Sequence, residues 1–191
     1  MNLTSSLSCA ALGLALAFGA QSALAQQQLV PAQSEVQFTA RQMGVPLDGH
    51  FKKFSAQVAF DPARLATSKI AFTVDTGSAT LGSRETDAEL PKPTWFNVPK
   101  FPQAQFESTA IKALGGGKFE VAGKLTIKGT AQNVTVPVAL AQNGATTTAT
   151  GTLPLKRLAF KIGENEWADT SMVADDVTVK FKLALTGVGK L

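Results

Sequence analysis

The sequence predicts an all-β domain, built as an antiparallel β-barrel in water with one short helical segment near residues 83–90. Three observations lead to this fold class. Apolar and polar residues alternate with a period of two along most of the chain, as in strands that bury one face. Gly, Pro, Asn and Asp separate the alternating segments. Helical periodicity after the N-terminal segment is confined to one short stretch.

The clearest predicted strand covers residues 118–128, where apolar residues at odd positions oppose Lys, Glu and Thr at even positions. The same alternation recurs along residues 36–40, 54–60, 70–74, 133–140 and 177–185. Gly129 and the run at 115–117 are predicted hairpin turns. Closing such strands into a barrel removes exposed sheet edges and leaves the polar face in water. A membrane barrel would show the opposite pattern, apolar outside and polar inside.

The helical segment is predicted to begin after Ser83, which suits an N-cap and is followed by acidic residues in the first turn. Pro91 then ends it. Trp95 and Phe96 follow, and we expect these two large apolar side chains in a loop or short turn.

Residues 1–25 are predicted to be a cleaved signal peptide. The segment has no charged side chain, a short apolar stretch, and Ala23-Leu24-Ala25 as a cleavage signal. No Lys or Arg precedes the apolar stretch, which is atypical, and glycines make that stretch unlike a membrane span. Residues 26–191 then form a single exported domain. The sole cysteine, Cys9, precedes the apolar stretch, so a lipid anchor is not expected and the mature domain has no thiol.

Charge and composition argue against several function classes. The formal net charge is +4, but no run of basic residues is longer than a pair, and basic residues are not interleaved with aromatic ones, so nucleic-acid binding is not expected. His50 is the sole histidine, expected at the start of a strand facing solvent, and no G-x-S-x-G motif accompanies it. Acidic residues such as Glu107 and Glu120 fall on the polar faces of strands, and Asp175-Asp176 is too small a cluster for calcium. We therefore expect no catalytic residue, no metal site and no cofactor, and a protein that is not an enzyme.

The remaining candidates for function are the apolar residues, above all the phenylalanines and the two tryptophans. They either fill the core or line a cavity, because a small barrel can do one or the other. Composition leaves both alternatives open.

Several segments, in this order, resemble those of one protein family. They are residues 34–40, 49–54 (G-H-F-K-K-F), 58–62 (V-A-F-D-P), 74–78, 86–90, 95–97, 101–109, 121–130 and 156–163. Together they make Ser34 to Leu185 similar to the YceI-like family of polyisoprenoid-binding periplasmic proteins. Many members carry Arg-Asp-x-His-Leu where this chain has residues 86–90 as T-D-A-E-L. A head-group role for that Arg and His is therefore not carried over, although Arg84 could substitute.

The resemblance implies a lipocalin-like barrel with an elongated apolar cavity that carries a polyisoprenoid, a quinone-like lipid or another long-chain amphiphile in the periplasm. By this resemblance the candidate ligand-binding residues are Phe38, Phe54, Val58, Phe60, Phe72, Val74, Phe106, Phe119, Val121, Leu125, Val136, Phe160, Val179 and Phe181, with Leu90, Trp95 and Phe96 near a mouth or lid.

Two alternatives remain at this point. The protein could dock on a membrane cytochrome of the b561 type and hand over a quinone, as the resemblance also implies. It could instead be an enzyme acting on a lipid, although it lacks a nucleophile–base pair. A homodimer through exposed barrel strands is a further expectation.

Overall fold

The computed structural model describes residues 27–191, and the predicted signal peptide with Cys9 lies outside them. The strands are β1 (Gln28–Leu29), β2 (Glu35–Gln42), β3 (Val45–Phe51), β4 (Phe54–Ala59), β5 (Lys69–Asp75), β6 (Ala79–Thr80), β7 (Gln103–Gly115), β8 (Lys118–Ile127), β9 (Thr130–Asn143), β10 (Thr146–Lys156) and β11 (Asp176–Thr186). The single described α-helix is α1 (Arg84–Glu89), and 3-10 turns cover Pro31–Gln33, Leu65–Thr67, Thr76–Ser78, Arg157–Phe160 and Asn165–Ala168. The predicted all-β class and the short helix are confirmed.

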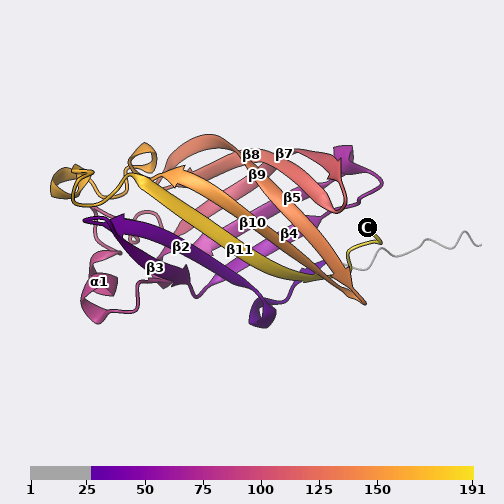
Figure 1. Cartoon of the computed structure of the whole chain (residues 1–191), viewed down its shortest axis with the longest axis horizontal. Coiled ribbons are helices and arrows are strands. Elements are labelled where there is room, and N and C mark those ends of the chain that lie inside the picture. Colours follow the sequence, from indigo (N-terminus) through magenta and orange to yellow (C-terminus); the bar gives the residue numbers. More distant parts are fainter. Residues whose placement is uncertain (1–26) are drawn as a thin grey trace, which may run out of the picture.

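All strand pairs are antiparallel and belong to one sheet, in the order β4-β5-β7-β8-β9-β10-β11-β2-β3-β6, with β1 added to β11. The sheet curls around a common interior, with α1 and the loops after β10 at one end and the C-terminus at the other (Figure 1). Its two ends, β4 and β6, do not pair with each other in the described chain. A seam therefore runs along the free edge of β4.

Hydrogen bonds join the two sides of this seam near its ends. Where β3 turns into β4, the amide of Lys52 donates to the carbonyl of Ser78 at 3.1 Å, and that of Lys53 to Ser78 Oγ at 3.0 Å. At the other end, Gln27 Nε2 donates to the carbonyl of Phe60 at 2.6 Å, and the Phe60 amide donates to Gln27 Oε1 at 2.8 Å. One side-chain amide thus replaces a pair of ladder hydrogen bonds where no strand is available.

The predicted hairpins are confirmed. β8 and β9 are joined by Lys128 and Gly129, both with positive φ (48° and 74°), as a tight two-residue turn requires. β7 and β8 are joined through the glycine run at 115–117. Along β8 the odd positions are buried or half-buried and face inward, as the alternation predicts.

Besides the open seam, the structure differs from the sequence-based expectation in its strands and in the cap of its helix. β10 was not predicted, because its inner face carries Thr147, Ala149 and Gly151, which give almost no apolar alternation. His50 lies near the end of β3, not at the start of a strand, since the chain is already extended from Val45. Ser83 occupies the N-cap of α1, but its hydroxyl donates to Glu85 Oε2 at 2.9 Å and accepts no backbone N–H of the helix.

No helix within residues 27–191 combines the length and the apolar character that a membrane crossing needs.

Candidate functional site: an apolar cavity inside the sheet

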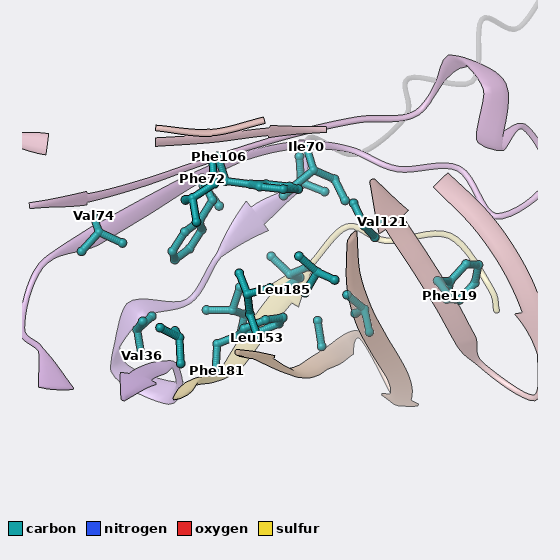
Figure 2. Close-up of a pocket in the computed structure, with 18 of the residues that line it drawn as sticks. Val36, Ile70, Phe72, Val74, Phe106, Phe119, Val121, Leu153, Phe181 and Leu185 are labelled. Atoms are coloured by element: carbon teal, nitrogen blue, oxygen red, sulfur yellow. The ribbon is translucent and has the colours of Figure 1, made fainter. Parts of the chain in front are cut away.

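The curled sheet encloses a cavity of about 220 Å³. Its walls are formed by Val36, Phe51, Ala56, Val58, Phe60, Ile70, Phe72, Val74, Phe96, Ala104, Phe106, Ile111, Phe119, Val121, Leu125, Ile127, Val136, Val138, Leu140, Thr147, Ala149, Leu153, Leu155, Val179, Phe181, Leu183, Leu185 and Val188. Nearly all of these residues come from the inner faces of strands. In Figure 2, Ile70, Phe72 and Phe106 on one wall face Leu153, Phe181 and Leu185 on the other.

The space exists partly because small residues occupy the inner face of some strands. Ala56, Ala104, Thr147 and Ala149 all line the cavity, and their short side chains leave the wall recessed. Where β10 has Gly151, the ring of Phe181 on β11 lies so close that an added Cβ would stand 2.3 Å from it. A larger side chain at any of these positions would fill part of the interior.

The cavity wall carries no titratable side chain, and Thr147 is its single polar residue. The Thr147 hydroxyl accepts a hydrogen bond from Gln142 Nε2 at 3.2 Å and is fully buried. An unpaired charge moved into such an interior would lose its hydration without compensation. The part of a ligand that enters the cavity must therefore be apolar, and any charged group must stay outside.

Most of the residues predicted to line a cavity do lie on its wall. They are Val58, Phe60, Phe72, Val74, Phe96, Phe106, Phe119, Val121, Leu125, Val136, Val179 and Phe181. This is a statement of position, since whether they touch a ligand stays a prediction.

The other predicted residues lie elsewhere. The Phe38 ring covers Gly49 and has its centroid 5.2 Å from that of Phe51. Phe54 has its ring 5.9 Å from that of Phe72 and borders a cleft beside the seam. Leu90 and Phe160 are buried, and Trp95 pairs with Trp167 at 5.5 Å. Phe38 and Phe54 therefore contact the wall residues Phe51 and Phe72.

Several wall residues were not predicted from the sequence, for two reasons. Thr147, Ala149, Leu153 and Leu155 belong to the strand that was not predicted. Ile111 follows a shift of register between Ser108 and Ala110, which moves inward-facing positions from even to odd numbers along β7. Strict alternation could not have found Ile111, whereas Leu153 and Leu155 do lie two residues apart on one face of β10.

The loops at the α1 end are organised around a buried cation, Arg157, which is 3% exposed. All five of its N–H groups donate to backbone carbonyls, those of Ala174, Ile162, Gly163, Trp167 and Val173, at 2.6–3.0 Å. Burial lowers the pKa of Arg157, and the nearby charge of Asp175 opposes that shift. Nearby, buried Lys128 Nζ donates to the carbonyl of Lys161 at 2.7 Å and pairs with Glu164 at 2.8 Å.

The residues considered for catalysis are not brought together. His50 and Glu107 are exposed, on β3 and β7, and neither lines the cavity. Within residues 27–191, no three His, Cys, Asp or Glu side chains form a group that could hold a metal ion.

Comparison with known proteins agrees with this architecture. The model of the YceI-like domain family matches residues 27–185. A UPF0312 protein of Yersinia pestis is 34% identical over 134 residues, which cover 68% of this chain and 69% of the relative. A UPF0312 protein of Vibrio parahaemolyticus is 31% identical over 127 residues, covering 66% and 67%.

Solved structures give the same result. The crystal structure of BcnA from Burkholderia cenocepacia has a TM-score of 0.79 and 51% identity, covering 82% of this chain and 98% of BcnA. A polyisoprenoid binding domain from Saccharophagus degradans has a TM-score of 0.69, covering 84% and 98%, and shares the fold at 13% identity. The cavity, the sheet and these matches together show that the chain belongs to the YceI-like domain family.

Proposed function

We propose that this protein is a carrier that holds the tail of a polyisoprenoid, or of a similar long-chain amphiphile, inside its sheet. The observation that carries this proposal is the cavity wall, which offers apolar contact throughout and no titratable group. The similarity in fold to a protein described as a polyisoprenoid binding domain supports the choice of ligand class. A lipid-binding role also fits membership of the YceI-like family.

Apolar burial alone can supply the affinity. Each buried CH₂ contributes about 0.8 kcal/mol, so a long tail binds without specific polar contacts. The cavity of about 220 Å³ is below the range of roughly 300–1,000 Å³ typical of pockets for compact small molecules. A slender, flexible chain suits such a space better than a compact ring system.

The first test is mass spectrometry of an organic extract of the protein purified from a periplasmic fraction. We expect a polyprenyl or quinone-type lipid in stoichiometric amount. The matched variants are Ala149→Phe, which adds a ring to the cavity wall, and Thr150→Phe, which adds the same ring on the outer face of β10. The first should lose the lipid and the second should keep it. A lipid-free extract, with no uptake of added isoprenoid, would contradict the carrier function.

We further propose that the carrier acts in the periplasm after removal of residues 1–25. The uncharged, apolar start and the Ala23-Leu24-Ala25 sequence support this. N-terminal sequencing of the protein from fractionated cells should give Gln26 as the first residue. A chain that keeps Met1 and remains in the cytoplasmic fraction would contradict export.

The carrier is proposed to act without catalysis. His50→Ala should leave the bound lipid chemically unchanged, because His50 is exposed and outside the cavity wall. A lipid that accumulates in a different chemical form in this variant would instead support an enzyme.

A second candidate function, docking on a membrane cytochrome of the b561 type, is favoured by an apolar surface on the tips of two loops. Met43, Val45 and Met172 are 69%, 61% and 41% exposed, and the Met43 amide donates to the Met172 carbonyl at 2.8 Å, so the tips lie together. Met43 also adopts a positive φ of 48°, which is unfavourable for its side chain. Immobilised protein should retain haem absorbance from solubilised membranes, and Met43→Ser with Met172→Ser should abolish it. Equal retention by this variant would contradict docking through these tips.

A further inference from the structure

A cleft opens beside the seam, between the start of β2 and the corner that joins β3 to β4. The last residue pair between β2 and β3 is Gln37 with His50, and beyond it the two strands separate. β4, which follows the corner, pairs with β5 and with no strand on its other side within the described chain. The resulting opening, the seam cleft, lies between residues 34–37 and 50–54 and has a volume of about 720 Å³.

The seam cleft adjoins the apolar cavity. Val36 and Phe51 border both spaces. Val36 is 3% exposed and is among the side chains of the cavity wall shown in Figure 2. These two residues therefore stand between the surface cleft and the apolar interior.

The lips of the seam cleft carry a positive charge. Lys52 and Lys53 are exposed on one lip, beside His50, and among residues 27–191 neither lysine makes an ion pair. The opposite lip carries one carboxylate, that of Glu35. Lys182 of β11 is its cross-strand neighbour, and Glu35 Oε2 accepts a hydrogen bond from Gln37 Nε2 at 3.2 Å. The cleft therefore has two lysines against one carboxylate.

We propose that the seam cleft is the head-group site of the carrier and that Lys52 and Lys53 select amphiphiles with an anionic head. This inference rests on the proposed carrier function. A phosphate or carboxylate head would accept charge-assisted hydrogen bonds from the two ammonium groups, while its tail passes Val36 and Phe51 into the cavity. The head group is assigned to the cleft and the tail to the cavity because the cavity wall excludes charge, whereas the adjoining cleft carries two lysines.

The test compares three probes with the same tail, farnesol, farnesyl phosphate and farnesoic acid, by calorimetric titration of the delipidated full chain. We expect the two anionic probes to bind at least tenfold more tightly than farnesol, and 0.5 M salt to reduce this preference since the cleft is open to solvent. The ratio of the dissociation constants of farnesyl phosphate and farnesoic acid identifies which head group the cleft prefers.

The decisive variant is Lys52→Gln with Lys53→Gln, which should bind all three probes about equally and keep the affinity for farnesol. The control is Lys112→Gln with Lys118→Gln, near the β7–β8 hairpin, which removes the same net charge away from the cleft and should keep the preference. Equal binding of all probes by the unmodified protein, or a preference that survives in the cleft variant, overturns the head-group site alone. Failure of every probe to bind overturns the carrier function as well.

Discussion

At the scale of single residues, Arg157 is a buried cation whose five N–H groups all need hydrogen-bond acceptors. A buried guanidinium without a carboxylate in contact is stable here because backbone carbonyls accept all of its hydrogens. These carbonyls come from the loops between β10 and β11, so Arg157 fixes the path of a segment with little regular structure.

We therefore expect Arg157→Met to lower the free energy of unfolding by about 3–5 kcal/mol, because several buried carbonyls lose their donor together. Arg157→Lys should also destabilise, since an ammonium group has three donors and cannot span the same acceptors. Urea denaturation measures both. The control Arg64→Met changes an arginine whose side chain is 66% exposed and should cost about 1 kcal/mol or less. A loss below 1 kcal/mol for Arg157→Met would contradict this account of the loops.

A second feature at this scale is the close contact of a phenylalanine ring with a glycine in a strand, which occurs at Gly49, Gly123 and Gly151. A phenylalanine ring from the neighbouring strand lies over each, and an added Cβ would stand 2.3–2.5 Å from that ring. We expect Gly151→Ala to cost about 1–3 kcal/mol, because its Cβ would displace the ring of Phe181, a cavity-wall residue, and would also stand 2.7 Å from the Pro137 carbonyl oxygen, and we expect it to weaken lipid binding. Thermal and urea unfolding check the first effect, and titration with farnesol checks the second. Gly189→Ala is the control, because its nearest contact, Pro62 Cδ, is 3.9 Å away; equal effects at the two positions would argue against the ring contact.

The sequence predicted large inward residues well and small ones poorly. Phe119 and Val121 stand out in an alternating strand, and the structure places both on the cavity wall. Ala149 and Thr147 also line the cavity, but neither residue type carries a signal for burial. The alternation of apolar and polar residues therefore did not predict the recessed part of the wall, although these small residues help to create the cavity.

At the scale of elements, α1 is too short to be stable alone and is held by its contacts with the segment around β6. Asp87 of α1 accepts a hydrogen bond from the Thr80 hydroxyl at 2.5 Å and one from the Leu81 amide at 2.7 Å. These two bonds lower the pKa of Asp87, and Lys52 and His50 add a smaller effect in the same direction, while burial acts against them.

Asp87→Asn should consequently destabilise the protein in a pH-dependent way. Because the folded state lowers the pKa of Asp87, its stabilising effect is complete above the unfolded pKa of about 3.9 and disappears as the pH falls through the lowered value. The difference in unfolding free energy between the unmodified protein and Asp87→Asn should be largest at pH 7 and shrink below about pH 4. Urea unfolding at pH 7, 5 and 3 measures it. A pH-independent effect of Asp87→Asn would refute the linkage.

Hairpins were the most predictable elements, since their turns carry glycine between clear alternations. The β8–β9 turn is an example, with Gly129 at a φ of 74°. β3 and β10 were harder, because Pro, Gly and Thr dilute their alternation. The register shift in β7 has no residue signature, as it depends on how β8 pairs with it.

At the scale of the whole molecule, alternation predicted a barrel but not where its wall is incomplete. Whether β4 meets another strand depends on the length and angle of the β3–β4 corner, which no local pattern encodes. Ser78 at one end and Gln27 at the other form hydrogen bonds across the seam, and nothing in the sequence pattern distinguishes these two polar residues. Likewise, alternation separates the two faces of a strand but does not distinguish a filled core from a cavity.

The whole molecule should gain stability from its ligand in a way that locates the binding space. A ligand that binds only the folded state adds RT ln(1 + [L]/Kd), about 2.7 kcal/mol at a hundredfold excess over Kd. Urea unfolding of the delipidated protein with farnesol should show this increase for the unmodified chain and for Thr150→Phe. Ala149→Phe should show none, because its ring occupies the cavity, and without ligand it should unfold at a similar or higher urea concentration, since it fills space that is otherwise empty. If farnesol stabilises Ala149→Phe as much as the unmodified protein, the lipid binds elsewhere and the interior serves only as the core of the fold.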